Sequence, residues 1–343
     1  MGQGIDMNDF FRPLAQTGDA RPDEAITLAG TKSWFTHVEH LTPSGPVGIL
    51  PAADTPATWR AAVSSARPSI AGLDFSAPVI MGILNVTPDS FSDGGSFVSA
   101  SQALRKAETM VQDGAHLLDI GGESTRPGAL EVPYEAEIAR TVPVIEAIRR
   151  KMDVPLSIDT RKVRVAHAAV EAGANIVNDV SGFNFDPDLG PFCVAASAPV
   201  CLTHSQGLPE TMQNAPTYDN VLLDVYQFLE QQIELAMGYG LRREQITVDP
   251  GLGFGKTQAH NLALIRGLSL FHGLGCAVVL GASRKGFIRD IGQAPAPQDR
   301  GPGSIGVALA AAMQGVQILR VHDVAETRQA LALWQASTIG AGS

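Results

Sequence analysis

The chain has 343 residues, 45% of them hydrophobic, and a formal net charge of −10 at pH 7. This length allows a sizeable buried core and fits one barrel-sized domain with an extension better than two full domains. The acidic balance disfavours nucleic acid and anionic membrane surfaces as partners, and no uncharged apolar run reaches the roughly 18 residues of a membrane span.

The beginning of the chain lacks the basic and apolar regions of a signal peptide, so we expect a cytoplasmic location. The three cysteines, Cys193, Cys201 and Cys276, are widely spaced and have apolar neighbours. This pattern predicts buried free thiols and argues against a disulfide or a zinc site.

Residues 1–77 are dense in Pro, Gly, Thr and Ala. They predict an irregular N-terminal extension that packs on the main domain, with short strands at 25–29 and 33–41 and a helix at 59–65. We assign no chemistry to this extension, because aromatic and histidine residues in a short strand are usually packing residues.

Residues 78–338 alternate short apolar runs with helical patterns. The runs cover 79–84, 116–120, 154–158, 175–177, 200–202, 246–248, 277–281 and 315–319. Helices are predicted at 101–113, 134–151, 221–237, 260–268, 304–313 and 324–335, and after Thr160, which is placed to cap a further helix. An open doubly wound sheet would show similar runs, but eight of them favour an α/β fold of the (β/α)8 TIM barrel type.

Polar residues follow these runs, and the strand ends of a barrel share one rim. Asp159, Asn178, Asp249 and Lys285 stand at or just beyond the third, fourth, sixth and seventh runs. Singly, each is explained by helix capping or loop ordering. Together, two carboxylates, an amide and an ammonium form a donor and acceptor set suited to a flat, nitrogen-rich heterocycle.

A second group is cationic or becomes so on protonation. It consists of Arg126, Arg284, Lys285, Arg320 and His322. Most of the group flanks the seventh and eighth runs, where barrels of this kind frequently bind phosphate, so a diphosphate is the natural partner. The alternative is that these are rim charges in surface ion pairs.

The loop after the first run offers Asn85 and Asp89 as hard oxygen ligands for Mg²⁺ bound to phosphate, although an ordinary long loop explains them equally well.

The glycine-rich stretch from Gly251 to Thr257 suggests a phosphate-binding loop. Its spacing is one residue short of that motif, so we expect its glycines to let the backbone turn tightly beside Asp249.

Seven motifs carry a family resemblance. They read MGILNVTPDSFSDGG at 81–95, DIGGESTRPGA at 119–129, SIDT at 157–160, VNDV at 177–180, DPGLGFGK at 249–256, SRK at 283–285 and RVHD at 320–323. From about Pro78 onward the chain resembles the dihydropteroate synthases of folate biosynthesis. The resemblance implies condensation of 6-hydroxymethyl-7,8-dihydropterin diphosphate with 4-aminobenzoate, giving 7,8-dihydropteroate and diphosphate.

The resemblance also implies residue roles. Asp159, Asn178, Asp249 and Lys285 would hold the pterin, Thr125, Arg126, Arg320 and His322 would meet the diphosphate, and Asn85 would bind Mg²⁺. Phe91, Pro127, Ser283 and Gly286 would form the aminobenzoate pocket, over which Asp89 also closes. Asp89, Arg126, Lys285 and Arg320 would be the residues most directly involved in catalysis. A homodimer is expected from the family alone.

Two departures from the family pattern fall beside these sites. Thr203 and Ser205 replace methionines that many relatives carry, and Gly286 replaces a serine after the SRK motif. Two rival functions remain: a methyltetrahydrofolate-corrinoid methyltransferase, and a catalytically silent pterin-binding protein. The diphosphate-facing motifs disfavour the first, and the complete polar set disfavours the second.

Overall fold

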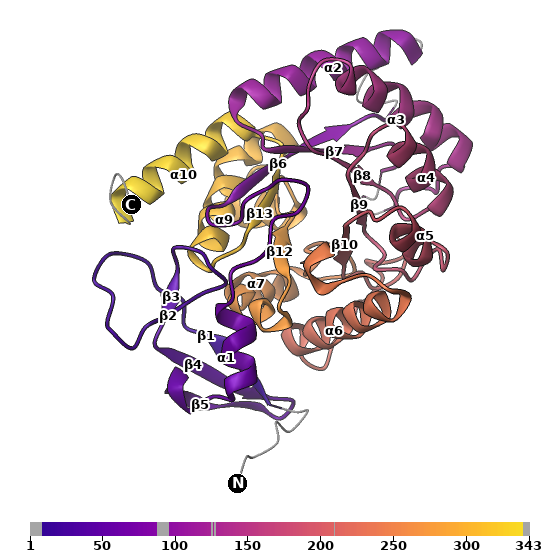
Figure 1. Ribbon diagram of the computed structural model, residues 1–343. Coiled ribbons are helices and arrows are strands. Elements are labelled where there is room, and N and C mark those ends of the chain that lie inside the picture. Colours follow the sequence, from indigo (N-terminus) through magenta and orange to yellow (C-terminus); the bar gives the residue numbers. More distant parts are fainter. Residues whose placement is uncertain (1–8, 88–95, 125, 127, 209, 339–343) are drawn as a thin grey trace.

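A computed structural model describes residues 9–87, 96–124, 126, 128–208 and 210–338. Within them, eight parallel strands close into a barrel in chain order, because β13 pairs with β6 (Figure 1). The strands are β6 (Val79–Asn85), β7 (Leu117–Gly121), β8 (Leu156–Asp159), β9 (Ile176–Asp179), β10 (Val200–Thr203), β11 (Ile246–Asp249), β12 (Ala277–Leu280) and β13 (Ile318–Val321). The predicted (β/α)8 barrel is confirmed.

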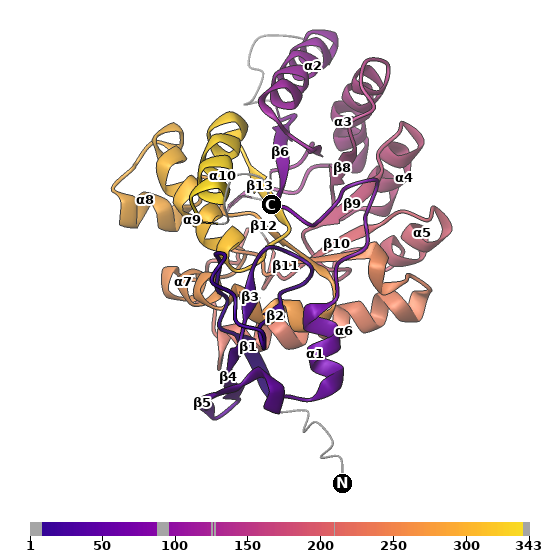
Figure 2. The same cartoon turned by 60° about the vertical axis from the view of Figure 1, so that its left-hand side comes forward.

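Helices surround the strands as an outer ring (Figures 1 and 2). They are α2 (Ser96–Asp113), α3 (Tyr134–Arg149), α4 (Val163–Glu171), α5 (Leu189–Ala195), α6 (Val221–Tyr239), α7 (Gln258–Arg266), α8 (Gly286–Gly292), α9 (Gly301–Met313) and α10 (Val324–Thr338), with 3₁₀ turns η3 (Arg243–Gln245), η4 (Leu268–Leu274) and η5 (Pro297–Arg300). Local sequence fixes several ends: the Asn220 side chain caps α6, and Gly240, at φ 117°, ends it.

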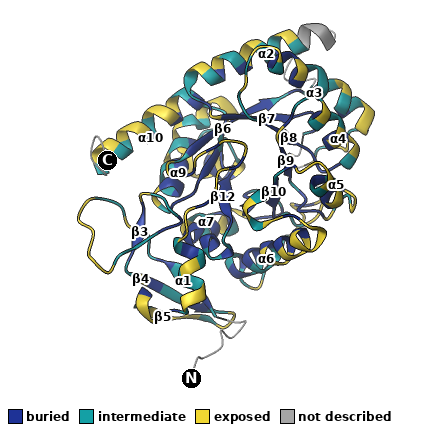
Figure 3. Cartoon of the chain, viewed as in Figure 1, coloured by how far each residue is buried: buried dark blue, intermediate teal, exposed yellow. Residues whose placement is uncertain are grey.

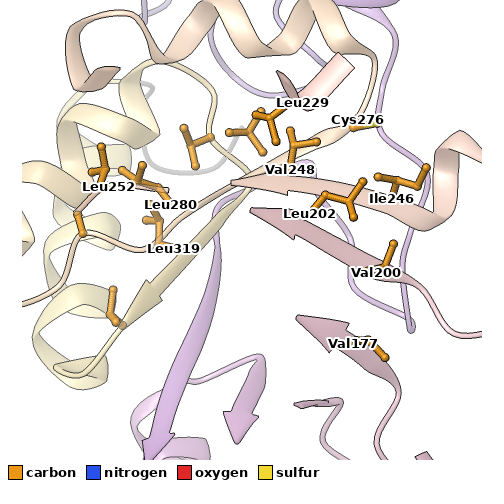
Figure 4. Close-up of a cluster of buried hydrophobic side chains, with 14 of the residues drawn as sticks. Val177, Val200, Leu202, Leu229, Ile246, Val248, Leu252, Cys276, Leu280 and Leu319 are labelled. Atoms are coloured by element: carbon orange, nitrogen blue, oxygen red, sulfur yellow. The ribbon is translucent and has the colours of Figure 1, made fainter. Parts of the chain in front are cut away.

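Alternate residues of each strand face opposite sides. One set, which includes Val177, Val200, Leu202, Val248 and Leu280, packs with helix residues such as Leu229 of α6 (Figure 4). This layer between strands and helices forms the main core, and the barrel strands carry much of the dark blue of buried residues in Figure 3. The apolar runs are therefore continuous because both faces of the sheet are covered.

The other set faces the barrel interior. Near the amino ends of the strands it is apolar, and the segment before β6 adds Ile70, Leu73 and Phe75, which close this end of the barrel. We call this group the amino-end plug: Ile70, Leu73, Phe75, Val79, Met81, Leu117, Ile176, Cys201, Ala277, Val279 and Ile318.

The extension forms a small layer on the same end of the molecule (Figure 2). It contains β1 (Phe10–Pro13), β2 (Ile26–Thr27), β3 (Trp34–Phe35), β4 (His37–Thr42), β5 (Gly45–Pro51), the 3₁₀ turn η1 (Ala52–Asp54) and α1 (Ala57–Ser64). Strands β1, β4 and β5 form one antiparallel sheet, while β2 pairs with β3. The Ser269 hydroxyl of η4 donates to the Pro13 carbonyl at 2.7 Å, which ties this layer to the barrel.

Several local predictions differ from the structure. Strands β1 and β5 and helices α5 and α8 were not predicted, and α2 begins five residues before the expected position. Thr160 does not cap α4: the helix begins at Val163, whose N–H donates to Asp186 at 2.8 Å. The three cysteines are free and buried, as predicted. Among the described residues, no helix is both long and apolar enough to cross a membrane.

Candidate active site

The carboxyl ends of the strands bring polar residues to one mouth. In the strand register Asp159 pairs with Asn178, Gly121 with Asp159, and Thr203 with Asp249. Leu117, Ile176, Cys201 and Ile318 face the interior at the amino end, and the next inward position of each strand, two residues further along, is polar. These polar residues are Asp119, Asn178, Thr203 and Arg320. Three of the four residues predicted to contact a heterocycle share this interior layer, and Lys285 reaches it from the loop after β12.

Arg320 on β13 links two inward carboxylates. Its Nε donates to Asp119 Oδ2 and its Nη2 to Asp159 Oδ2, each at 2.6 Å. Asn178 Nδ2 donates to the same Asp119 oxygen at 3.1 Å. The second oxygens of Asp119 and Asp159 are buried and have no hydrogen-bond partner within the described chain. A buried acceptor of this kind is costly unless a ligand supplies a donor.

Burial shifts the pKa values of the ionisable groups in this layer. It raises the pKa of Asp159 to about 7, against the lowering effect of Arg320 and with a further rise from Asp119. It also raises the pKa of Asp249, against Lys285. Burial lowers the pKa of Lys285 to about 8, which Asp249 partly offsets. Perturbed pairs of acid and base in one recess are typical of binding and catalytic sites.

Lys285 and Asp249 are both held by the loop after β11. Lys285 Nζ donates to the Leu252 carbonyl and lies 4.5 Å from the centre of the Phe254 ring. Asp249 Oδ1 accepts from the Gly251 N–H at 2.7 Å. The glycines after Asp249 thus make the tight turn predicted for them.

Glycines leave space at the mouth. A Cβ on Gly121 would lie 3.6 Å from Asn85 Oδ1 and 3.6 Å from Asp159 Cβ, so the half-buried Asn85 amide faces the Asp159 carboxylate across this glycine. A Cβ on Gly281 would lie 3.5 Å from Asp249 Oδ2 and 3.7 Å from Arg320 Cδ. Asn85 therefore borders the same recess as Asp159.

The predicted cationic group is only partly cationic. Burial lowers the pKa of His322 to about 3, and Arg284, Arg320, Lys106 and Arg126 lower it further, so the imidazole is neutral. Its Nδ1 lies 3.0 Å from Ser283 Oγ, which also accepts from the His322 N–H.

The two remaining arginines of that group differ in their surroundings. Arg284 forms an ion pair with Asp323 and makes a second contact to it at 3.1 Å. Arg126 is exposed on the loop after β7.

Gly286 is the first residue of α8, so its N–H lies at the beginning of a helix. Asp89, Phe91, Thr125 and Pro127 lie outside the described residues.

A cavity of about 250 Å³ lies beside this cluster at the carboxyl end of the barrel. It is lined by Arg161, Val180, Ser181, Asn184, Phe185, Ser205, Gly207, Leu208, Met212 and Phe254. Phe254 faces both the cavity and Lys285. Ser205, one of the residues that depart from the family pattern, belongs to this wall.

Sequence reasoning missed Asp119 as a site residue. It is fully buried and holds both Arg320 and Asn178. The available signal was a carboxylate inside an apolar run, because a buried charge requires partners. It also missed a buried network at the base of the loop after β7, in which Lys162 contacts Glu123 at 3.1 Å and Glu137 at 2.8 Å.

Comparison with known proteins gives a consistent picture. Residues 81–322 match the family described as pterin binding enzyme. The chain is 46% identical over 260 residues to a dihydropteroate synthase of Synechocystis, covering 75% of this chain and 90% of that protein. It is 44% identical over 265 residues to the Escherichia coli dihydropteroate synthase, covering 77% of this chain and 93% of that protein.

Solved structures of dihydropteroate synthases also match the chain. A Yersinia pestis dihydropteroate synthase with a bound sulfonamide drug matches with a TM-score of 0.74 at 44% identity, over 79% of this chain and 98% of that one. A Xanthomonas albilineans dihydropteroate synthase in complex with 7,8-dihydropteroate matches with a TM-score of 0.71 at 40% identity, over 77% and 95% of the two chains.

Proposed function

The chain belongs to the dihydropteroate synthase family of pterin-binding enzymes, and from this premise we propose that its barrel mouth joins a dihydropterin diphosphate to 4-aminobenzoate. The products are 7,8-dihydropteroate and diphosphate. The observation that carries the proposal is the inward layer of Asp159, Asn178 and Asp249 with Lys285, in which a buried Asp159 oxygen has no partner within the described chain.

Asp159, Asn178, Asp249 and Lys285 are proposed to bind the pterin ring. The unpartnered Asp159 oxygen would accept from an N–H of the ring, and Asn178 and Lys285 would present donors to its acceptors. Each charge-assisted hydrogen bond of this kind contributes about 1.5–3 kcal/mol, and a ring without the matching groups would leave buried acceptors unpaired. The layer therefore supplies specificity as well as affinity.

Thr125, Arg126, Arg320 and His322 are proposed to meet the diphosphate. His322 would do so as a neutral hydrogen-bond donor, because the pKa of its imidazole lies at about 3. The cationic contribution then comes from Arg126 and Arg320, together with Lys285 at pH values below its pKa of about 8.

Asn85 fits a role in holding Mg²⁺. Its amide oxygen is a hard ligand that borders the recess beside Gly121, and Mg²⁺ usually takes only one or two protein ligands together with water and substrate phosphates. When bound, the ion supplies positive charge that neutralises the leaving diphosphate. Asp89, in the segment that follows β6, is proposed to assist.

The aminobenzoate is proposed to enter between the loops that follow β6, β7 and β12. Phe91, Pro127, Ser283 and Gly286 are its proposed neighbours. Gly286 has no side chain, so the N–H at the start of α8 is the group offered to the carboxylate at this position. A solved relative from Xanthomonas albilineans contains 4-aminobenzoic acid, which supports aminobenzoate as a substrate.

In the proposed reaction the bond between the pterin methylene carbon and diphosphate oxygen breaks, and the aminobenzoate nitrogen forms the new bond to that carbon. The chain positions the two substrates and stabilises the charge on the departing diphosphate. An arylamine is already unprotonated at neutral pH, so we nominate no general base. The proton that the nitrogen loses passes to the diphosphate or to water.

We also propose that the protein acts as a homodimer in the cytoplasm. The dimer is proposed from the family alone, and the location from the biosynthetic role of the synthases that the chain resembles. Sedimentation equilibrium of the purified chain tests the dimer: a mass near 36.1 kDa would contradict it.

Diphosphate release tests the proposed activity. The purified protein is mixed with dihydropterin diphosphate, 4-aminobenzoate and Mg²⁺, and each component is omitted in turn. We expect release that requires both the amine and Mg²⁺, and a loss of about tenfold or more in Lys285→Ala. Pterin binding without turnover would indicate a silent binding protein, and methyl transfer from methyltetrahydrofolate to a corrinoid protein would indicate the methyltransferase.

A further inference from the structure

The loop between β11 and α7 contains a buried amine that none of the roles above uses. Lys256 is only 3% exposed. Its Nζ lies 2.8 Å from His204 Nδ1 and 2.8 Å from the Gly251 carbonyl, with the Phe254 carbonyl at 3.1 Å. The His204 carbonyl is a weaker contact at 3.4 Å.

These partners belong to two separate segments. Gly251 and Phe254 are in the loop after β11, whereas His204 is the first residue after β10. Carbonyl oxygens only accept, so Nζ donates to them and joins the two backbones. Because an unpaired buried amine or carbonyl is costly, removing this side chain would strand several acceptors at once.

The two segments approach so closely that glycine is required between them. A Cβ on Gly251 would lie 1.9 Å from the His204 carbonyl oxygen, and a Cβ on Gly255 would lie 2.4 Å from that of Gln206. Both glycines have positive φ values, 68° and 63°. The Tyr218 hydroxyl adds an outer contact, donating to the Gly255 carbonyl at 2.8 Å.

The loop after β11 also contacts two of the residues proposed to bind the pterin, Asp249 and Lys285. The Gly251 N–H donates to Asp249, while the Gly251 carbonyl accepts from Lys256. The Phe254 ring lies under Lys285 Nζ, while the Phe254 carbonyl accepts from Lys256. One residue, Gly251, thus separates Lys256 from the Asp249 carboxylate, and one residue, Phe254, links it to the ring beneath Lys285.

We propose that Lys256 is a positioning residue for pterin binding: its buried amine fixes the loop 251–255 against the end of β10 and so sets Asp249 and Phe254. Lys256 itself would not touch the substrate. This inference rests on the proposed function, because it assigns Asp249 and Lys285 to the pterin.

Lys256→Met tests the proposal, with Arg67→Met as its matched control. Arg67 is likewise a buried side chain that donates to carbonyls, those of Ala62, Ser65 and His272, but it lies at the amino end of the barrel. Both variants are expected to lower the melting temperature. The dissociation constant of 6-hydroxymethyl-7,8-dihydropterin diphosphate is measured by calorimetry well below both melting temperatures.

In Lys256→Met we expect this dissociation constant to rise by about tenfold or more, while the KM for 4-aminobenzoate at saturating pterin changes by less than about twofold. In Arg67→Met both constants should stay within about twofold of those of the unmodified protein. Equal pterin affinity in the two variants would overturn the proposal, because a purely structural role predicts that outcome.

Tyr218→Phe keeps the test decisive if Lys256→Met does not fold. This change removes only the hydrogen bond from the Tyr218 hydroxyl to the Gly255 carbonyl, and we expect pterin affinity to fall by about threefold. Unchanged affinity in Tyr218→Phe would then overturn the proposal. The unmodified protein separates the two hypotheses: if it neither binds pterin nor releases diphosphate, the proposed function itself fails.

Discussion

The two ends of the barrel interior are filled with opposite kinds of side chain, although the same strands supply both. At the amino end, the strands contribute Met81, Leu117 and Val279 to the apolar amino-end plug, which Leu73 and Phe75 complete from the segment before β6. At the carboxyl end, Asp119, Asp159 and Arg320 form buried ion pairs in the inward positions. The difference shows which end stabilises the fold and which end is arranged for a ligand.

Buried charge pairs seldom stabilise a protein more than apolar residues of the same size, because removing both charges from water is costly. The carboxyl end also leaves acceptors of Asp119 and Asp159 without partners within the described chain. An arrangement that is unfavourable for folding indicates selection for binding. The plug gives the opposite indication, since it offers packing and no chemistry.

The largest effect is expected from emptying the plug. Phe75→Ala removes a side chain that is 2% exposed, and the cavity it leaves should cost about 3–5 kcal/mol of unfolding free energy. Urea denaturation measures this loss. Val47→Ala, at a site 63% exposed on β5, is the control and should cost less than about 0.5 kcal/mol.

Substantially weaker pterin binding in Phe75→Ala would contradict the separate roles assigned to the two ends of the barrel. The folded fraction should keep its pterin dissociation constant within about twofold, because Phe75 lies in the apolar cluster at the far end of the interior.

A smaller effect, of about 1.5–3 kcal/mol in pterin binding, is expected from Asp159→Asn. The change keeps the size of the side chain but replaces an acceptor with a donor at the proposed ring contact. Titration calorimetry should show pterin affinity reduced by about tenfold to a hundredfold.

Asp179→Asn is the control for that variant. Asp179 is equally buried and adjacent in sequence to Asn178, but its oxygens accept from Ser181 and Phe183. Pterin affinity should stay within about twofold there. If the two variants lost equal affinity, burial alone would explain both, and Asp159 would have no special role.

The smallest effect is expected from pH. Pterin binding is proposed to need ionised Asp159, with a pKa raised to about 7, and protonated Lys285, with a pKa lowered to about 8. Affinity should therefore rise as Asp159 loses its proton and fall as Lys285 loses its own, giving a maximum between about pH 7 and 8. Measurements from pH 5.5 to 9.5 check this, and Lys285→Ala should lose the alkaline limb. A flat profile would contradict the assignment.

Apolar runs buried on both faces fit an open doubly wound sheet as well as a barrel, and their number, eight, was what predicted the barrel. The polar strand endings also predicted that Asp159, Asn178, Asp249 and Lys285 gather at one mouth, since parallel strands bring their carboxyl ends together. Their proposed role in binding a pterin came from the family resemblance. Asp119 and Lys256 were missed because their partners, Arg320 and His204, are distant in sequence. Strand β5 was missed for another reason: its exposed residues and two glycines give no alternating pattern.

A crystal structure with 6-hydroxymethyl-7,8-dihydropterin diphosphate bound tests the central claim most directly. The account predicts ring density between Asp159, Asn178, Asp249 and Lys285, with the Asp159 oxygen that lacks a partner in the described chain now accepting from the ring. Ring density confined to the neighbouring cavity between Phe185 and Leu208, with Asp159 still contacting only Arg320, would contradict it.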